Sequence, residues 1–266
     1  MSRTTDVRGP VIDAHGHVGG WADFFVPEPD ATWLVDVNTE IGIDVVGVSH
    51  LVAVGRDAAA GNELALAEAE RYPGRIGVWL VADPHRPDAV APLRDQLERP
   101  GVWGLKLHPD THECAVTDPR YEPLLELAAA AGVPVLSHGQ TRSPYSDPGD
   151  LAEVARRHST LPVLVGHAGL WQDGFDRAAR LAAAHPNLYL EICGSRLTTR
   201  WLERLVAVAG ADRVLFGTDA CFLDPRLGLG KVRHARLSDA DRALVLGGNA
   251  ARLLGRRLTI ASQETP

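Results

Sequence analysis

The 266-residue sequence predicts a closed (β/α)8 barrel of the α/β class. Short runs rich in Val, Ile and Leu recur along the whole chain, and there are eight of them. Their starts lie roughly 25 to 34 residues apart, which is about the length of one strand plus a crossover helix. The intervals between the runs look helical, and strands that alternate with helices indicate a parallel sheet with covered faces.

The eight predicted strands are continuous apolar runs rather than alternating ones, as is typical of parallel strands that are buried on both faces. In chain order they are VIDAH (11–15), VVGVSHL (45–51), IGVWLVA (76–82), VWGLKLH (102–108), VPVLSH (133–138), LPVLVGH (161–167), NLYLEIC (187–193) and RVLFGTD (213–219).

The predicted helices end repeatedly at Gly or Pro, which stop helices. Asn62 is the expected N-cap of the first of these helices, and Gly132 is the expected stop of the second. An open doubly wound sheet is the alternative fold, but no glycine-rich phosphate loop follows any predicted strand. The helical segments are NELALAEAERYPG (62–74), YEPLLELAAAAGVP (121–134), LAEVARRHS (151–159), FDRAARLAAAHPN (175–187) and the late GNAARLLGRR (248–257).

The chain contains no linker and no low-complexity segment, so a single domain spanning residues 1–266 is expected. Its barrel core is predicted over 8–257, with polar tails at 1–7 and 258–266. Barrels of about 250 residues commonly form one domain, which agrees with this length.

Composition excludes several classes of protein. A net charge of −7 argues against a nucleic-acid-binding protein, which needs a clustered basic face. No stretch of about 18 apolar residues is present, so no membrane span is expected, and the polar N-terminus is too short for a signal peptide. The cysteines Cys114, Cys193 and Cys221 are odd in number and scattered, which favours a reducing, cytoplasmic location.

Ionisable residues directly follow strand after strand. In a (β/α)8 barrel these strand ends meet at the face that carries the chemistry, and burying such groups is costly unless they are paired or bind a metal. Taken singly, a histidine here could be a core residue. The aliphatic stem of Lys106 could lie over the rim of the barrel with its ammonium in water. Their coincidence at one end of the barrel favours a metal site. The residues are His15, His17, His50, Lys106, His108, His138, His167, Glu191 and Asp219.

The arrangement of these residues resembles the amidohydrolase superfamily: HxH on the first strand, Lys on the fourth, His on the fifth and sixth, and Asp on the eighth. Within it, the sequence is similar to the amidohydrolase-related (amidohydrolase 2) branch of TIM-barrel metal-dependent hydrolases and decarboxylases. The resemblance covers nearly the whole chain. The segments that carry it are IDAHGHVG, GLKLHP, VLSHG, VLVGHAG, LFGTDA and the late helix GNAARLLG.

This resemblance implies that His15, His17, His138 and Asp219 ligate a divalent metal, most often zinc, with Mn²⁺ as an alternative ion. His167 would be either a ligand of a second metal or the catalytic histidine that polarises the substrate. Imidazoles and a carboxylate suit zinc, and zinc lowers the pKa of bound water towards about 7. Asp219 could hold that water and move its proton to a leaving group.

Lys106 distinguishes two versions of such a site. In some members of the superfamily the equivalent lysine is carboxylated and, with His138 and His167, would hold a second metal. In others one metal serves, and Lys106 would remain a cation that binds a substrate carboxylate or an oxyanion. We favour one metal because His108-Pro109 directly follows the lysine, as in the branch that the chain resembles.

Two arginines in predicted top loops, Arg142 and Arg196, join Lys106 and His108 as candidate substrate-binding residues. Arg binds a carboxylate through a bidentate fork, so the four residues together predict a small anionic substrate. The alternative for each arginine is a solvated loop position.

Other residues near the predicted site have two open interpretations. Glu191 could orient a ligand histidine or form a structural ion pair. Trp21, Phe24 and Phe25 could form an apolar lid over the HxH segment or simply pack against it. Cys221 lies close to Asp219, but a buried structural thiol is the simpler reading.

The leading functional hypothesis is a metal-dependent hydrolase in which metal-activated water attacks an amide, ester or lactone carbonyl of a small, carboxylate-bearing molecule. Asp219 would act as general base and then acid, while His167 and Lys106 would stabilise the oxyanion. The alternative that the resemblance permits is a lyase, a metal-dependent non-oxidative decarboxylase of an aromatic or unsaturated carboxylic acid. Homodimers are common among proteins that resemble this one, so a homodimer is one expected assembly.

Overall fold

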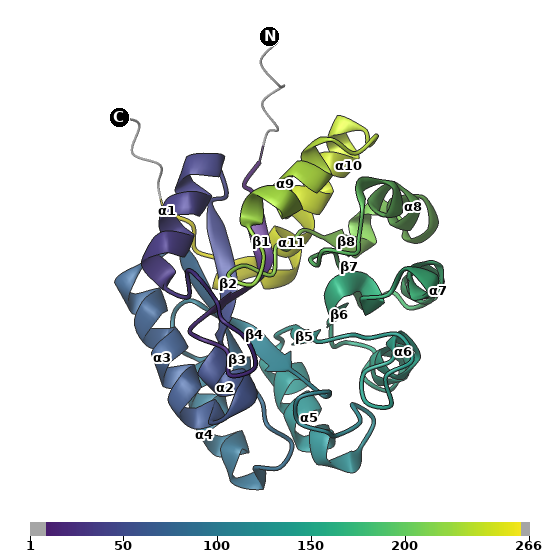
Figure 1. Cartoon of the computed structure of the whole chain (residues 1–266). Coiled ribbons are helices and arrows are strands. Elements are labelled where there is room, and N and C mark those ends of the chain that lie inside the picture. Colours follow the sequence, from purple (N-terminus) through teal and green to yellow (C-terminus); the bar gives the residue numbers. More distant parts are fainter. Residues whose placement is uncertain (1–8, 262–266) are drawn as a thin grey trace.

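The computed structural model describes residues 9–261, in which eight parallel strands form a nearly closed barrel with helices outside it (Figure 1). The strands pair in chain order from β1 to β8, so each of the eight predicted runs is confirmed as a strand. They are β1 (Ile12–Val18), β2 (Val45–His50), β3 (Ile76–Val81), β4 (Val102–Leu107), β5 (Val135–Ser137), β6 (Val163–Val165), β7 (Leu188–Glu191) and β8 (Val214–Leu215).

Helices connect successive strands and cover the outside of the barrel, as predicted. Gly132 ends α5 in the left-handed conformation, with φ of 63°, as a helix-terminating glycine does. The α-helices of the described chain are α1 (Ala31–Ile41), α2 (Leu51–Gly55), α3 (Ala58–Arg71), α4 (Val90–Leu97), α5 (Glu122–Ala131), α6 (Pro148–Arg157), α7 (Gln172–Ala184), α8 (Thr199–Ala209), α9 (Pro225–Arg233), α10 (Asp239–Ala243) and α11 (Asn249–Leu254).

The prediction that Asn62 caps α3 is wrong. The helix begins earlier, and its N-cap is Asp57, whose carboxylate accepts a hydrogen bond from the Ala60 amide at 3.1 Å. Asn62 is buried inside the helix and forms two hydrogen bonds with Val81 at the end of β3, at 3.0 and 2.8 Å. The preceding alanines favour helix, so the helix extends through them and Asn62 is free to join it to the sheet.

Strand β1 is longer than predicted and carries the HxH segment within it rather than after it. The register against β2 shifts between Asp13 and Gly16, and the strand then continues to Val18. Because residues two apart in a strand point to the same face, His15 and His17 share one side of β1.

The barrel closes between β1 and the segment that follows β8. The backbone amide of Asp219 donates to the carbonyl of His15 at 2.8 Å. The fully buried Asp13 carboxylate accepts from the amide and the hydroxyl of Thr218, at 3.0 and 2.6 Å. Burial raises the pKa of Asp13 to about 8. These contacts fix His15 and Asp219 at one seam of the barrel.

Two tryptophans fill the barrel interior. Trp79 and Trp103 meet edge to face with ring centroids 6.0 Å apart, and the Trp79 indole donates to the Ala14 carbonyl at 3.0 Å. Glycines make room for them, since a Cβ on Gly77 would lie 2.1 Å from a ring atom of Trp103. The interior is therefore a packed core, which leaves the strand ends as the place for polar groups.

The single domain with its core at 8–257 stays a prediction, and residues 1–8 and 262–266, which hold most of the two predicted tails, lie outside the described residues. Within residues 9–261, no helix is both long and apolar enough to cross a membrane.

Candidate metal centre

Three predicted ligands meet at the seam of the barrel. The Nε2 atoms of His15 and His17 lie 3.8 and 3.3 Å from Oδ1 of Asp219. His15 and His17 come from β1, and Asp219 follows β8 with a left-handed backbone, φ of 63°. All three side chains lie at or just below the surface of the hollow, with side-chain exposures of 1, 5 and 14%.

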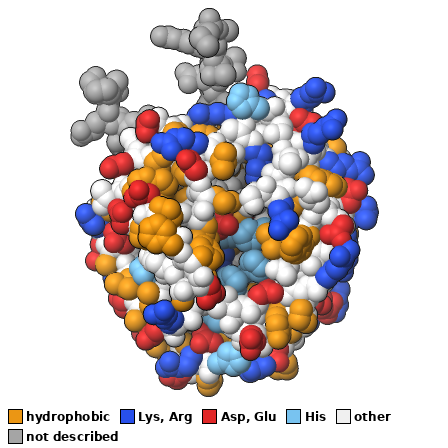
Figure 2. All heavy atoms as spheres, viewed as in Figure 1, with side chains coloured by type: hydrophobic (Ala, Val, Ile, Leu, Met, Phe, Trp, Pro, Cys, Tyr) orange, Lys and Arg blue, Asp and Glu red, His pale blue; other side chains and the backbone are white. Residues whose placement is uncertain are grey.

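The other predicted histidines continue this cluster. The His15 ring lies 5.1 Å from the His167 ring, and the His167 ring lies 4.9 Å from the His138 ring, measured between centroids. His108 stacks on His138 at 4.4 Å. Figure 2 shows histidine side chains gathered in the central hollow of this face. The structure thus brings together His15 from within β1 and residues that follow the fourth, fifth and sixth strands.

Lys106 occupies the middle of the cluster. It is 1% exposed, and its ammonium lies 2.7 Å from Nε2 of His15, to which it donates. Burial lowers the pKa of Lys106 to about 8. No carboxylate of residues 9–261 lies in direct contact with this ammonium, and a buried cation without one is costly, which marks this position as one that a functional anion could satisfy.

Glu191 holds the opposite side of the same histidine. Its Oε2 lies 2.6 Å from Nδ1 of His15, and the carboxylate is fully buried at the end of β7. Both interpretations of Glu191 stay open, because the same contact would orient a ligand histidine or form a structural ion pair. With Nδ1–H donated to Glu191, the tautomer of His15 leaves the lone pair on Nε2, the nitrogen that faces Asp219.

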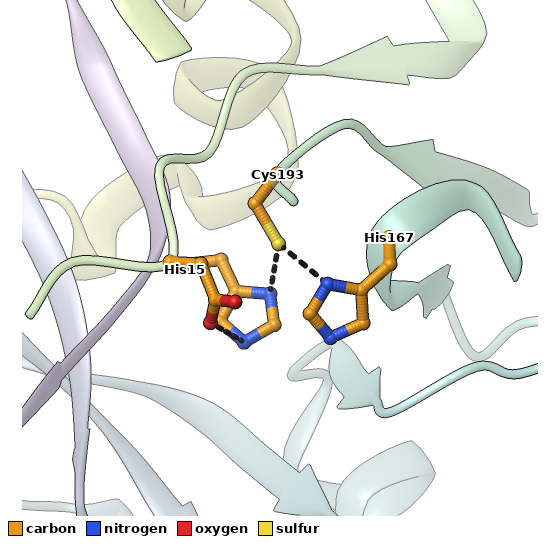
Figure 3. A group of neighbouring side chains, drawn as sticks. His15, His167 and Cys193 are labelled. Atoms are coloured by element: carbon orange, nitrogen blue, oxygen red, sulfur yellow. Dashed lines mark hydrogen bonds and ion pairs between the residues drawn. The ribbon is translucent and has the colours of Figure 1, made fainter. Parts of the chain in front are cut away.

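Cys193 is a site residue that the sequence did not single out. Its sulfur lies 3.3 Å from Nδ1 of His15 and 3.0 Å from Nδ1 of His167 (Figure 3). Four residues each place one potential ligand atom within 4.8 Å of the others: His15, His167, Cys193 and Asp219. The sequence feature that could have indicated Cys193 is its spacing from Glu191. The two residues are two apart at a strand end, and such residues point to the same face of a strand.

The ionisation states of the donors fit a divalent cation. Burial and the neighbouring Lys106 hold the pKa of His15 well below its ordinary value, so its imidazole is neutral and can ligate. Burial alone would raise the pKa of Asp219, but the hydrogen bond from His17 and the adjacent His167 hold it well below the usual range. Neutral imidazoles and one carboxylate are a donor set that zinc and manganese both accept.

Neither predicted arginine forms a hydrogen bond or ion pair with this cluster within residues 9–261. Arg142 is 79% exposed at its side chain and forms an ion pair with Asp173. Arg196 is exposed and lies over the ring of Trp171, 4.0 Å from its centroid. His108 remains close through its stacking on His138. Lys106 and His108 are thus the members of the predicted anion-binding group that contact the cluster, and a substrate role for the two arginines stays a prediction.

Aromatic side chains flank the cluster on the β1 side. Phe222 lies 5.2 Å from the ring of His17, and Phe24 and Trp21 lie 5.2 and 6.0 Å from Phe222. We call Trp21, Phe24 and Phe222 the aromatic wall. Phe25, which was grouped with Trp21 and Phe24, is 85% exposed instead.

Comparison with protein families finds one match, to the family described as Amidohydrolase, over residues 12–256. A search of curated proteins finds no match.

Several solved structures that are similar to this chain are named as decarboxylases, and others are named as amidohydrolases. One is 5-carboxyvanillate decarboxylase LigW from Sphingomonas paucimobilis, 17% identical with a TM-score of 0.71, covering 92% of this chain and 98% of that one. A second is 2,6-dihydroxybenzoate decarboxylase in complex with 2,6-dihydroxybenzoate. It is 18% identical with a TM-score of 0.72, covering 92% of this chain and 98% of that one. A third is dihydroxybenzoic acid decarboxylase from Polaromonas sp. JS666 with bound manganese and the inhibitor 2-nitroresorcinol. It is 17% identical with a TM-score of 0.73, covering 92% of this chain and 97% of that one.

Proposed function

This chain belongs to the amidohydrolase family, and on that premise we propose that it is a metal-dependent non-oxidative decarboxylase of an aromatic carboxylic acid. The similar solved structures support this lyase hypothesis better than the hydrolase hypothesis that led the sequence analysis, because those whose names state a reaction are decarboxylases of aromatic acids. Identities below 20% carry the fold alone, so the reaction has to be argued from the site.

The buried ammonium of Lys106 is the observation that carries the proposal. It donates to Nε2 of His15, the nitrogen that also faces Asp219. This nitrogen cannot accept from Lys106 and ligate a metal with the same lone pair. In the loaded protein Lys106 therefore needs another partner, and a substrate carboxylate would satisfy a cation that is 1% exposed.

The aromatic wall supports an aromatic rather than an aliphatic acid. Phe222 lies beside the ring of His17, and Phe24, which packs against Phe222, is 54% exposed. Aromatic side chains favour offset or edge contacts with another ring. A planar acid bound by Lys106 would meet such rings on the β1 side of the hollow.

His15, His17, His138 and Asp219 are the residues that would hold the metal. When bound, a divalent cation would stabilise negative charge on substrate oxygens. Manganese is our preferred ion, since the Polaromonas enzyme contains it, and zinc is the alternative. Glu191 orients His15 towards this set through Nδ1.

The reaction breaks the bond between the ring carbon and the carboxylate carbon. The electron pair of that bond remains on the ring, the ring carbon gains one proton, and carbon dioxide leaves. We assign the proton transfer to His167 or Asp219, which both border the cluster, and Lys106 would hold the carboxylate until the bond breaks.

The test uses protein loaded with Mn²⁺ and two probes, 2,6-dihydroxybenzoate and 5-carboxyvanillate, together with an aryl ester and an N-acyl amino acid. We expect carbon dioxide release from at least one aryl acid and no hydrolysis. His167→Asn should abolish the release, whereas the exposed His234→Asn should not. Ester or amide hydrolysis without carbon dioxide release would restore the hydrolase hypothesis.

A further inference from the structure

Cys193 lies where three polar groups of the site converge. Its sulfur is 3.0 Å from Oε2 of Glu191, 3.0 Å from Nδ1 of His167 and 3.3 Å from Nδ1 of His15. Its own amide donates to Oε1 of Glu191 at 2.5 Å, which fixes the residue directly after β7. The side chain is 1% exposed. In Figure 3 the sulfur points between the two imidazole rings.

The hydrogens around this sulfur can be assigned. The carboxylate of Glu191 only accepts hydrogen bonds, so the Cys193 thiol donates its hydrogen to Oε2 of Glu191, at 3.0 Å. The sulfur then acts towards His167 as an acceptor, which requires that Nδ1 of His167 carry the hydrogen. His15 also has its hydrogen on Nδ1, because Glu191 is its closest partner there.

We propose that Cys193 is a positioning residue that sets the tautomer and orientation of His167: its sulfur accepts Nδ1–H and leaves Nε2 of His167 as the free basic nitrogen. This inference rests on the proposed function only where it assigns that nitrogen a part in proton transfer. The contact itself does not depend on the proposed reaction.

The backbone of His167 explains why such support is needed. His167 has φ of 57°, the left-handed conformation that a residue with a side chain adopts at a cost. Glu191 accepts from the His167 amide at 3.3 Å and Cys193 holds the ring, so both anchors come from the end of β7. Moving either anchor would release the ring from its place beside His15.

The decisive measurement is the tautomer of His167 in metal-free protein. Long-range ¹H–¹⁵N correlation spectra of protein labelled at histidine distinguish Nδ1–H from Nε2–H, and His167→Gln identifies the signals. We expect Nδ1–H in the wild type and in Cys193→Ser, because a hydroxyl can also donate and accept. Cys193→Ala should lose the Nδ1–H signature. An Nε2–H tautomer in the wild type overturns the proposal.

If Cys193→Ala does not fold, the wild-type and Cys193→Ser spectra still decide between the two tautomers. If Cys193→Ala folds and its His167 signals match those of the wild type, the sulfur has no positioning role. Thermal unfolding of each variant gives the fold control.

A second measurement separates positioning from ligation. In Co²⁺-substituted protein a cysteine ligand produces sulfur-to-metal charge-transfer absorption in the near ultraviolet. We expect none in the wild type, and the same visible spectrum in Cys193→Ser. A near-ultraviolet band that disappears in Cys193→Ser would make Cys193 a ligand and refute its assignment as a positioning residue. Failure of Co²⁺ to bind at all would count against the proposed metal centre, while the tautomer would still decide the role of Cys193.

Discussion

At the scale of single residues, the imidazole of His15 lies between opposite charges. Glu191 contacts its Nδ1 at 2.6 Å and Lys106 contacts its Nε2 at 2.7 Å. The carboxylate increases the basicity of the ring and the ammonium competes for its lone pair. The two neighbours should therefore have opposite effects on metal binding.

Glu191→Gln should weaken Mn²⁺ binding by roughly 10- to 100-fold, the usual effect of removing a carboxylate that orients a ligand histidine. Electron paramagnetic resonance of free Mn²⁺ during titration measures this affinity. Glu126→Gln, at an exposed position of α5, is the matched control and should bind as the wild type does. Equal affinities in Glu191→Gln and the control would remove Glu191 from the metal centre.

Lys106→Met should bind Mn²⁺ at least as tightly as the wild type, because it removes a like charge 2.7 Å from the ligand nitrogen. Carbon dioxide release from aryl acids should be lost in the same variant, since the carboxylate would lack its cation. If Mn²⁺ affinity falls instead and the intact mass of the wild type includes one added carbon dioxide, Lys106 is a carboxylated ligand and the site holds two metals.

At the scale of elements, the sequence predicted where each strand lies but not how each one ends. All eight apolar runs were found as strands, yet β1 runs past the HxH segment and β8 is only Val214–Leu215. Apolar runs predict burial, whereas a strand ends where its hydrogen-bonded neighbour ends, and that neighbour is distant in sequence. Asn62 shows the same limit, because its partner Val81 belongs to β3.

Asn62→Ala should destabilise the protein by about 1–3 kcal/mol, because it leaves the Val81 amide and carbonyl buried without these partners. Urea unfolding measures the change. Asn38→Ala is the matched control: Asn38 is also buried, at 2% exposure, but its side chain has no hydrogen-bond partner among the described residues. Its replacement should cost far less. Equal losses would mean that side-chain packing, rather than the α3–β3 hydrogen bonds, matters.

At the scale of the whole molecule, the proposed metal would join β1, β5 and the segment after β8. This places it across the seam where the barrel closes. A ligand that binds only the folded state stabilises it by mass action. The homodimer expected from the sequence stays a prediction at this scale.

Mn²⁺ at 100 times its dissociation constant should therefore stabilise the protein by about 2.7 kcal/mol and raise its Tm by roughly 5–10 °C. Differential scanning calorimetry with and without Mn²⁺ measures the shift. The double variant His15→Ala, Asp219→Ala should show no shift. An equal shift in that variant would place metal binding elsewhere in the molecule.

The sequence alone determined the order of the strands, the barrel and the positions of the candidate ligand residues, because the spacing of apolar residues and the polarity of strand ends are local properties. It also predicted Lys106, His138 and Asp219 at one end of the molecule. Only the tertiary structure decided that Lys106 is buried against His15, that Arg142 points to solvent, and that Cys193 lies between two histidines. These are distances between residues far apart in sequence, and the closure of the barrel sets them.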